Sequence, residues 1–377
     1  MSPIIEGLRG LGALMVVVHH YVYSLSPAMA EALAGLHFFH AGVDLFFVLT
    51  GYLFAPLVLG IRHQSARVFI KRRVWRLYPL YLLSLALTVI FVPSSTLESW
   101  FENLALTLWQ FLQHLFFLQA APWQNLHGIA YFNEVYWTLS VEVAFYALVL
   151  VCLFLPATLS PKLRFWGLAL VSSVGFLIMH YWHYQPSNGN WLVRQAQLPT
   201  LLIEFWLGIA VFYWFYNKPE SSFSYNKIYY IKPWLLLFLS TVFLIILYVI
   251  YPLVSVGLIS PRPFGWFNLG VAFSFALLLA GLLLLDKQKA LHSVIKKPFK
   301  IGLKIIIHKT VLHLGSLSYG VYLLHSLVLL LLSGVFESPN LHLLASVLVT
   351  WLLAALLYRW FELPCRNYGR RPKKANF

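Results

Sequence analysis

Long runs of apolar residues dominate the chain, and they recur with a length of about twenty residues. A helix rises 1.5 Å per residue, so a run of this length can cross the hydrocarbon core of a bilayer. The alternation of apolar and polar residues that marks the strands of a membrane β-barrel is absent from the sequence. The pattern predicts ten membrane-spanning helices, at residues 7–26, 36–60, 77–93, 135–155, 164–182, 198–216, 233–252, 264–285, 314–333 and 341–361.

The segment 100–120 is the ambiguous part of this pattern. It is rich in aromatic and apolar residues such as Trp109, yet it also contains polar residues such as Gln113. We expect it to lie at the membrane interface or to re-enter the membrane without crossing it. With both termini in the cytoplasm, every Lys and Arg except Arg194 and Arg262 then falls on the inner side, as the positive-inside rule requires. A crossing at this segment would place the basic C-terminal tail outside.

Composition narrows the class of protein. Of the 377 residues, 60% are hydrophobic and 10% are charged, whereas soluble proteins carry about 25% charged residues. This excludes a soluble enzyme, a disordered regulator and a fibrous protein. The two cysteines, Cys152 and Cys365, are too few for a disulfide framework, and no Cys/His pair has metal-ligand spacing, so no metal is expected. The net charge of +15 is explained by the inner-side Lys and Arg, so no nucleic-acid partner is expected.

These observations predict the architecture. We expect an all-α, polytopic integral membrane protein of about ten transmembrane helices, with a single membrane domain over residues 1–377. A chain of this kind is a multi-pass protein of the cell (inner) membrane, with the lipid bilayer as its surroundings.

Titratable side chains inside the predicted spans share a similar depth. Each lies six to eight residues from the outer end of its span, which corresponds to about 10 Å below the outer surface. A charged group at membrane depth costs several kcal/mol, so each marks a candidate functional site. The agreement in depth predicts one polar cavity, lined by His20, Asp44, Glu142, Glu204 and His325.

A second, basic layer faces the cytoplasm. Arg9 begins the first span, and Arg72, Arg73 and Arg76 precede the third. Arg9 and His20 are eleven residues apart, so they share one face of a helix about 16 Å apart. Because the planar guanidinium group binds phosphate with two hydrogen bonds, this layer suits a phosphorylated head group. A long substrate held there would reach His20 with its other end.

Six motifs follow one another along the chain. They are R-x10-H over 9–20, "GVDLFFVLTGYL" over 42–53, "RRVWRLYPLY" over 72–81, "YWTLSVEVAFY" over 136–146, "GSLSYGVYLLH" over 315–325 and "FELP" over 361–364. In this order they resemble the membrane acyltransferase-3 family, bacterial enzymes that O-acylate cell-surface glycans with cytoplasmic acyl-CoA. The chain departs from the family where Val143 replaces a second Glu of many members and where the histidine is doubled.

The resemblance implies roles for individual residues. His20 matches the family's essential histidine and Arg9 its paired arginine. Arg73 and Arg76 match the R-x-x-R arginines that the family links to acyl-CoA. The acid of the W-[ST]-L-S-x-E motif and the aspartate of the G-V-D motif correspond to Glu142 and Asp44. Further candidates for the cavity wall, from their position alone, are Arg72, Tyr319, Tyr322, His325 and Glu204.

The expected function is therefore a membrane O-acyltransferase. It would move an acyl group, taken as acetyl from acetyl-CoA, to a hydroxyl group of a cell-surface or lipid-linked glycan. His20 would be the general base, oriented by Asp44 or Glu142. An acyl-histidine intermediate is the chemical alternative. A transporter or glycan-lipid translocase is the functional alternative, because intramembrane carboxylates and histidines also form proton relays.

Overall fold

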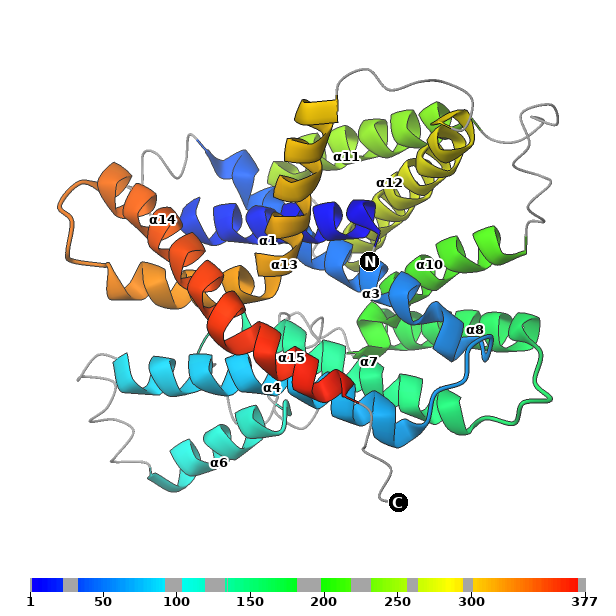
Figure 1. Cartoon of the computed structure of the whole chain (residues 1–377), viewed down its shortest axis with the longest axis horizontal. Helices are drawn as coiled ribbons and strands as arrows, with labels where there is room; N and C mark the ends of the chain where they lie inside the picture. The colour runs from blue at the N-terminus through cyan, green and yellow to red at the C-terminus, as the bar shows by residue number, and fades with distance from the viewer. Residues whose placement is uncertain are drawn as a thin grey trace.

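The computed structural model describes most of the chain, and its regular elements there are all helical. No β-strand occurs in the described residues, which are 2–22, 33–91, 104–118, 133, 135–181, 198–217, 232–255, 264–293 and 301–371. Figure 1 shows the helices as one bundle, with α1 and α3 near its centre and α6 at its edge. The protein is therefore all-α, as the sequence predicts.

Helices occupy each of the ten predicted spans. The predicted span ends at 23–26, 92–93 and 182, and the arginines Arg194 and Arg262, lie outside the described residues. In chain order the elements are α1 (Pro3–Val22), the 3-10 helix η1 (Ala34–Ala41), α3 (Gly42–Val58), α4 (Ala66–Phe91), α6 (Leu104–Leu115), α7 (Tyr136–Phe154), α8 (Pro161–Tyr181), α10 (Leu198–Tyr216), α11 (Pro233–Ser255), α12 (Phe264–Ser293), α13 (Ile301–Leu331), α14 (Pro339–Leu357), the π-helical turn η6 (Tyr358–Glu362) and α15 (Leu363–Arg370).

Length and composition make nine of the described helical segments suitable for crossing a membrane. The helix α1 is not among these nine; it carries Glu6 and Arg9 near its start and His19 and His20 near its end. The helix α4 begins at Ala66, well before the predicted span at 77–93. Lys and Arg favour helix formation, so the basic residues before the span extend the helix beyond its apolar part.

The outer surface of the bundle is apolar. Phe154 of α7 is 77% exposed, and Leu170 of α8, Phe238 of α11 and Leu348 of α14 are also exposed. Large continuous apolar surfaces are not maintained in water by a monomeric protein, so these faces are suited to contact lipid. Asp44, Glu204 and His325, by contrast, are buried among the helices.

The helix α6 forms part of the segment 100–120. It contains 12 residues, a length of about 18 Å, and is too short to cross a bilayer. His114 is buried, and its carbonyl oxygen accepts a hydrogen bond from the Tyr81 hydroxyl of α4 at 2.9 Å. Leu108 and Trp109 are exposed. The described part of this segment therefore packs against α4 with one face and leaves an apolar face uncovered; residues 100–103 and 119–120 lie outside the described residues.

Close backbone contacts fix the central helices. A Cβ atom at Gly51 of α3 would collide with the carbonyl oxygen of Phe205 in α10, and one at Gly208 of α10 would collide with that of Val48 in α3. The helices α1 and α13 meet in the same way, because Gly315 lies against the backbone of Glu6. Small residues allow such close approach of membrane helices. These two contacts set the positions of the site residues on α1, α3, α10 and α13.

Candidate active site

A cavity of about 540 Å³ opens between α1, α3, α4, α7, α13 and α15. This volume lies in the range of small-molecule sites. Its wall holds two glutamates, Glu6 and Glu142, and a large excess of cations. The arginines that line it are Arg9, Arg62, Arg72, Arg73, Arg76, Arg366 and Arg370. An excess of guanidinium groups in a partly enclosed space suits a ligand with several negative charges, such as phosphate groups.

The arginines of α4 present unused donors to this cavity. The Arg73 guanidinium group lies over the rings of Phe54 and Tyr146, with its central carbon 5.1 Å and 5.7 Å from the two ring centres. The Nε atoms of Arg72 and Arg73 are buried, and neither has a hydrogen-bond partner among the described residues. Buried donors are normally hydrogen-bonded. The α4 arginines are therefore arranged for a ligand.

Arg9 and Glu6 form the α1 side of the cavity. Their side chains are 13% and 12% exposed, and Nη1 of Arg9 lies 3.8 Å from Oε2 of Glu6. They are three residues apart on one helix face, where such pairs meet. Because Gly315 holds α1 against α13, this pair faces the same space as the arginines of α4 and α15.

Glu142 lies in this cavity too. It accepts a hydrogen bond from the Tyr146 hydroxyl, one turn further along α7. Arg73 and Arg76 are close enough for electrostatic interaction with its carboxylate. Glu142 thus balances part of the positive charge and holds Tyr146, on which Arg73 stacks.

The histidines form a separate cluster at the end of α1. The ring of His20 lies 5.0 Å from that of His325 in α13 and 5.1 Å from that of His19, between ring centres. The ring of His19 lies 5.9 Å and 5.7 Å from those of His37 and His40 in η1. His20 is half-buried and His325 fully buried.

Tyr322 lies between the cavity and the histidines. It lines the cavity, and its ring centre is 6.1 Å from that of His325. Its hydroxyl donates to the carbonyl oxygen of Val135 at 3.1 Å and lies 2.6 Å from the Thr138 hydroxyl. Tyr319, one turn earlier, also lines the cavity and donates its hydroxyl to the carbonyl oxygen of Leu77 at 2.8 Å. A tyrosine whose hydroxyl is held by hydrogen bonds therefore lies next to both the cavity and the histidines.

Asp44 and Glu204 form a third, isolated group. Both are buried, with 4% and 2% exposure, and their carboxyl groups are within hydrogen-bonding reach of each other. Such a bond requires a proton on one of the two groups. It joins α3 to α10, one turn from the close contact at Gly208. The ring of His20 lies beside those of His325 and His19, whereas Asp44 pairs with Glu204 and Glu142 with Tyr146.

The structure thus distributes the expected site residues over three places. Arg9, Arg72, Arg73, Arg76, Glu142, Tyr319 and Tyr322 line one cavity. His20 and His325 lie together and are not among its lining residues, and Asp44 pairs with Glu204. The shared depth along the helices does not by itself bring all five titratable groups into contact.

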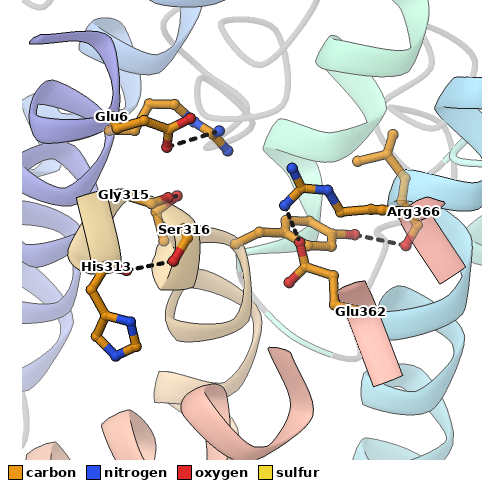
Figure 2. A network of polar contacts seen from close by, with 10 residues as sticks. Glu6, His313, Gly315, Ser316, Glu362 and Arg366 are labelled. Atoms are coloured by element: carbon orange, nitrogen blue, oxygen red, sulfur yellow. Dashed lines mark hydrogen bonds and ion pairs between the residues drawn. The ribbon is translucent and has the colours of Figure 1, made fainter. Parts of the chain in front are cut away.

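Sequence reasoning missed the contribution of α15. Arg366 and Arg370 lie one turn apart on this helix and line the cavity, and Arg366 is paired with Glu362 at 3.4 Å (Figure 2). Arg62 was also missed; it follows a turn in which Gly60 adopts a φ of 70°. The spacing of the two α15 arginines, which places them on one helix face, was the available signal.

No group of three or more His, Cys, Asp and Glu side chains in the described ranges is placed to hold a metal ion. The His19 ring meets the rings of His20 and His37 edge to face, with interplanar angles of 75° and 82°.

Comparison with known proteins assigns the class of this protein. The family profile described as "Acyltransferase domain" matches residues 3–359, and the chain therefore belongs to the acyltransferase-3 family of membrane acyltransferases. Residues 3–359 contain five of the six motifs noted above in full. No solved structure has significant similarity to the chain.

Three relatives carry names that describe O-acetyltransferases. The chain is 25% identical over 400 residues to the peptidoglycan O-acetyltransferase OatA of Listeria monocytogenes, covering 97% of this chain and 56% of that protein. It is 25% identical over 404 residues to the O-acetyltransferase OatA of Staphylococcus aureus strain MRSA252, with 99% and 59% covered. The putative peptidoglycan O-acetyltransferase YrhL of Bacillus subtilis is 25% identical, with 98% and 55% covered. The chain spans somewhat more than half the length of these relatives.

Proposed function

We propose that this protein transfers an acetyl group from cytoplasmic acetyl-CoA to a hydroxyl group of a cell-envelope glycan. The family and the named relatives support O-acetyl transfer as the reaction class. The arginine-lined cavity supports an anionic coenzyme as the donor, and the positive-inside rule supports its entry from the cytoplasm. The acceptor is a glycan on or linked to the membrane.

The phosphates of the donor lie against the arginines. Arg9, Arg73 and Arg76 bind the diphosphate of the coenzyme, and the unpartnered Nε of Arg73 supplies one of the donors. Arg366 and Arg370 bind the outermost phosphate, near the mouth, where Arg370 is exposed. Charge-assisted hydrogen bonds of this kind are about twice as strong as neutral ones. They hold the donor while its thioester extends along α1 toward Tyr322.

His20 acts as the general base at the end of this path. It takes the proton of the acceptor hydroxyl while the hydroxyl oxygen attacks the carbonyl carbon of the thioester. The carbon–sulfur bond then breaks, and the coenzyme thiolate takes up the proton from His20. Thioesters are reactive acyl donors, so base catalysis and positioning suffice for this step.

The carboxyl groups support the site from two sides. Glu142 anchors Tyr146 and balances the charge of Arg73 and Arg76, which keeps the phosphate site ordered before the donor binds. Asp44, through its bond to Glu204, fixes α3 against α10 and so shapes the wall of the cavity that α3 contributes. Both are positioning residues in this proposal.

The proposal rests on one spatial series of neighbouring side chains, which runs from Arg73 in the cavity through Tyr322 and His325 to His20. The test uses membrane vesicles containing the protein, radiolabelled acetyl-CoA and envelope glycan. We expect label on glycan hydroxyl groups and equimolar free CoA with the wild type, and neither with His20→Ala at equal protein level. Transfer by His20→Ala at the wild-type rate would refute the role of His20.

The same assay separates this proposal from a translocase. A glycan-lipid translocase would move the glycan across the vesicle membrane without releasing CoA. Free CoA that appears only when both acetyl-CoA and glycan are present supports the transferase. Glycan movement without CoA release would contradict it.

A further inference from the structure

His325 has one ring nitrogen occupied and the other unused. Nδ1 lies 2.8 Å from the carbonyl oxygen of Tyr322 and 3.1 Å from that of Val321. Carbonyl oxygens only accept hydrogen bonds, so Nδ1 must carry the hydrogen. In the neutral ring, Nε2 then carries a lone pair. The backbone of α13 therefore fixes the tautomer of His325.

The Nε2 atom of His325 needs a donor. It is buried and has no hydrogen-bond partner among the described residues, and the whole residue is 0% exposed. Buried polar atoms are normally paired, so a donor is expected to face this lone pair. The His325 ring is approached by His20 and Tyr21 of α1 and by Tyr322 of its own helix.

Among these neighbours, His20 fits best. The Tyr21 hydroxyl already bonds to Thr350, at 3.1 Å, and the Tyr322 hydroxyl to Val135 and Thr138. The His20 and His325 ring centres lie 5.0 Å apart at 46°. Two imidazole rings joined by a nitrogen–nitrogen hydrogen bond of about 2.9 Å have their centres about 5 Å apart. The two rings are therefore close enough for such a bond, although no nitrogen of His20 bonds Nε2 in the structure, and a change in the tilt of the His20 ring would form it.

We infer that His325 is the positioning residue of His20: its Nε2 accepts a hydrogen bond from one ring nitrogen of His20 and directs the other toward the acyl acceptor. The inference rests on the proposed function, because it gives His325 a role in acyl transfer. When His20 takes the acceptor proton, its ring carries two N–H groups. One points at the substrate, and the other remains bonded to the lone pair of His325, which stays neutral throughout.

This arrangement assigns to a histidine the task that the sequence suggests for Asp44 or Glu142. Those two groups bond to Glu204 and to Tyr146 instead. A neutral acceptor also suits the buried location, because it adds no further charge at membrane depth.

The test compares two replacements of His325 in membranes containing the full chain. His325→Gln retains an acceptor oxygen near the position of Nε2, whereas His325→Leu fills the space without one. With labelled acetyl-CoA and glycan, we expect His325→Leu to lower kcat by about tenfold or more, and His325→Gln to recover most of it. The KM for acetyl-CoA should stay unchanged in both, because His325 does not line the cavity.

A matched control is available on α14. His342 also bonds through its ring to a backbone carbonyl oxygen, that of Leu329, at 3.0 Å. His342→Leu should leave kcat unchanged while it tests the general effect of removing such a histidine. Protein amount and thermal unfolding in detergent are measured for every variant.

Two results would overturn the inference. One is a fall in kcat for His325→Leu no larger than for His342→Leu; the other is a His325→Gln variant as impaired as His325→Leu at equal stability. A failure of the proposed function would give a different result, namely acetyl transfer by His20→Ala at the wild-type rate. If His20→Ala is inactive while His325→Leu is fully active, the general base stands and only the role of His325 is lost.

Discussion

Replacing Arg73 by methionine tests the phosphate site most sharply. Methionine keeps much of the side-chain volume and its contact with the rings of Phe54 and Tyr146, but it removes the charge and the donors. The Nε of Arg73 has no partner within the described residues, and the Tyr146 hydroxyl, which is within hydrogen-bonding reach of the Arg73 guanidinium group, keeps its bond to Glu142 after the substitution. The fold should therefore tolerate the change, and the substitution should mainly weaken the binding of the donor phosphates.

The expected size follows from the contact that is lost. A hydrogen bond to a charged group contributes about 1.5–3 kcal/mol, and about 1.4 kcal/mol corresponds to a factor of ten in affinity at room temperature. Arg73→Met should therefore raise the KM for acetyl-CoA by about 10- to 150-fold. The kcat should change little, because the phosphates are bound equally in the ground state and the transition state. Arg73→Lys keeps the charge but lacks the planar guanidinium group, so its KM should lie between those of the wild type and Arg73→Met.

Initial rates of labelled acetyl transfer over a range of acetyl-CoA concentrations give both constants. The control is Arg67→Met, which removes an exposed arginine of the same helix that does not line the cavity. The reasoning is refuted if Arg73→Met leaves the KM unchanged, or if Arg67→Met raises it as much.

Other predictions concern packing and the remaining charges. Gly208→Ala places a Cβ against a carbonyl oxygen of α3 and should destabilise the protein by about 1–3 kcal/mol in thermal unfolding. Gly167→Ala is the control, because a Cβ there would have no atom within 4 Å, and it should leave the stability unchanged. Equal losses of stability in the two variants would contradict the close helix contact. Glu204→Leu leaves the buried Asp44 without its partner and should cost about 1–3 kcal/mol of stability, whereas Glu204→Gln keeps a donor and should cost less; unfolding scans that do not separate the two variants would contradict the pair. Arg370→Met should raise the KM for acetyl-CoA by a smaller factor than Arg73→Met, and the effect should shrink as salt is added, because Arg370 is exposed. A salt-independent effect would argue against an electrostatic contact.

Much of the fold follows from the sequence because membrane helices are specified by length and hydropathy alone. The spans at 198–216 and 233–252 agree closely with α10 and α11. The ends of helices that carry basic residues were less predictable. The helix α4 continues through its basic residues to Ala66, since helical propensity does not end where the apolar run ends.

The site was only partly predictable, because depth along a helix says nothing about the direction in which a side chain points. The arginines of α1 and α4 do share one cavity, as expected. Asp44, however, meets Glu204, since α3 and α10 approach each other at their glycines. Which helices touch is a property of tertiary packing, and a count of residues from the span ends cannot supply it.

The arginines of α15 were missed for a related reason. Near the C-terminus, Arg366 and Arg370 have the appearance of ordinary inner-surface charge. Their role depends on the packing of α15 against α4, where Gly369 lies against Trp75 and Lys71. That long-range contact brings α15 to the cavity, and no local pattern in the sequence indicates it.

The central claim is that one donor molecule spans the distance from the arginines to His20. It is tested most directly by an experimental structure of the protein with a bound acetyl-CoA analogue in which the thioester sulfur is replaced by a methylene group. The account predicts phosphates against Arg9, Arg73 and Arg76 and the acyl end beyond Tyr322, within hydrogen-bonding reach of His20. Phosphates bound outside the cavity, or an acyl group directed away from His20, would contradict it.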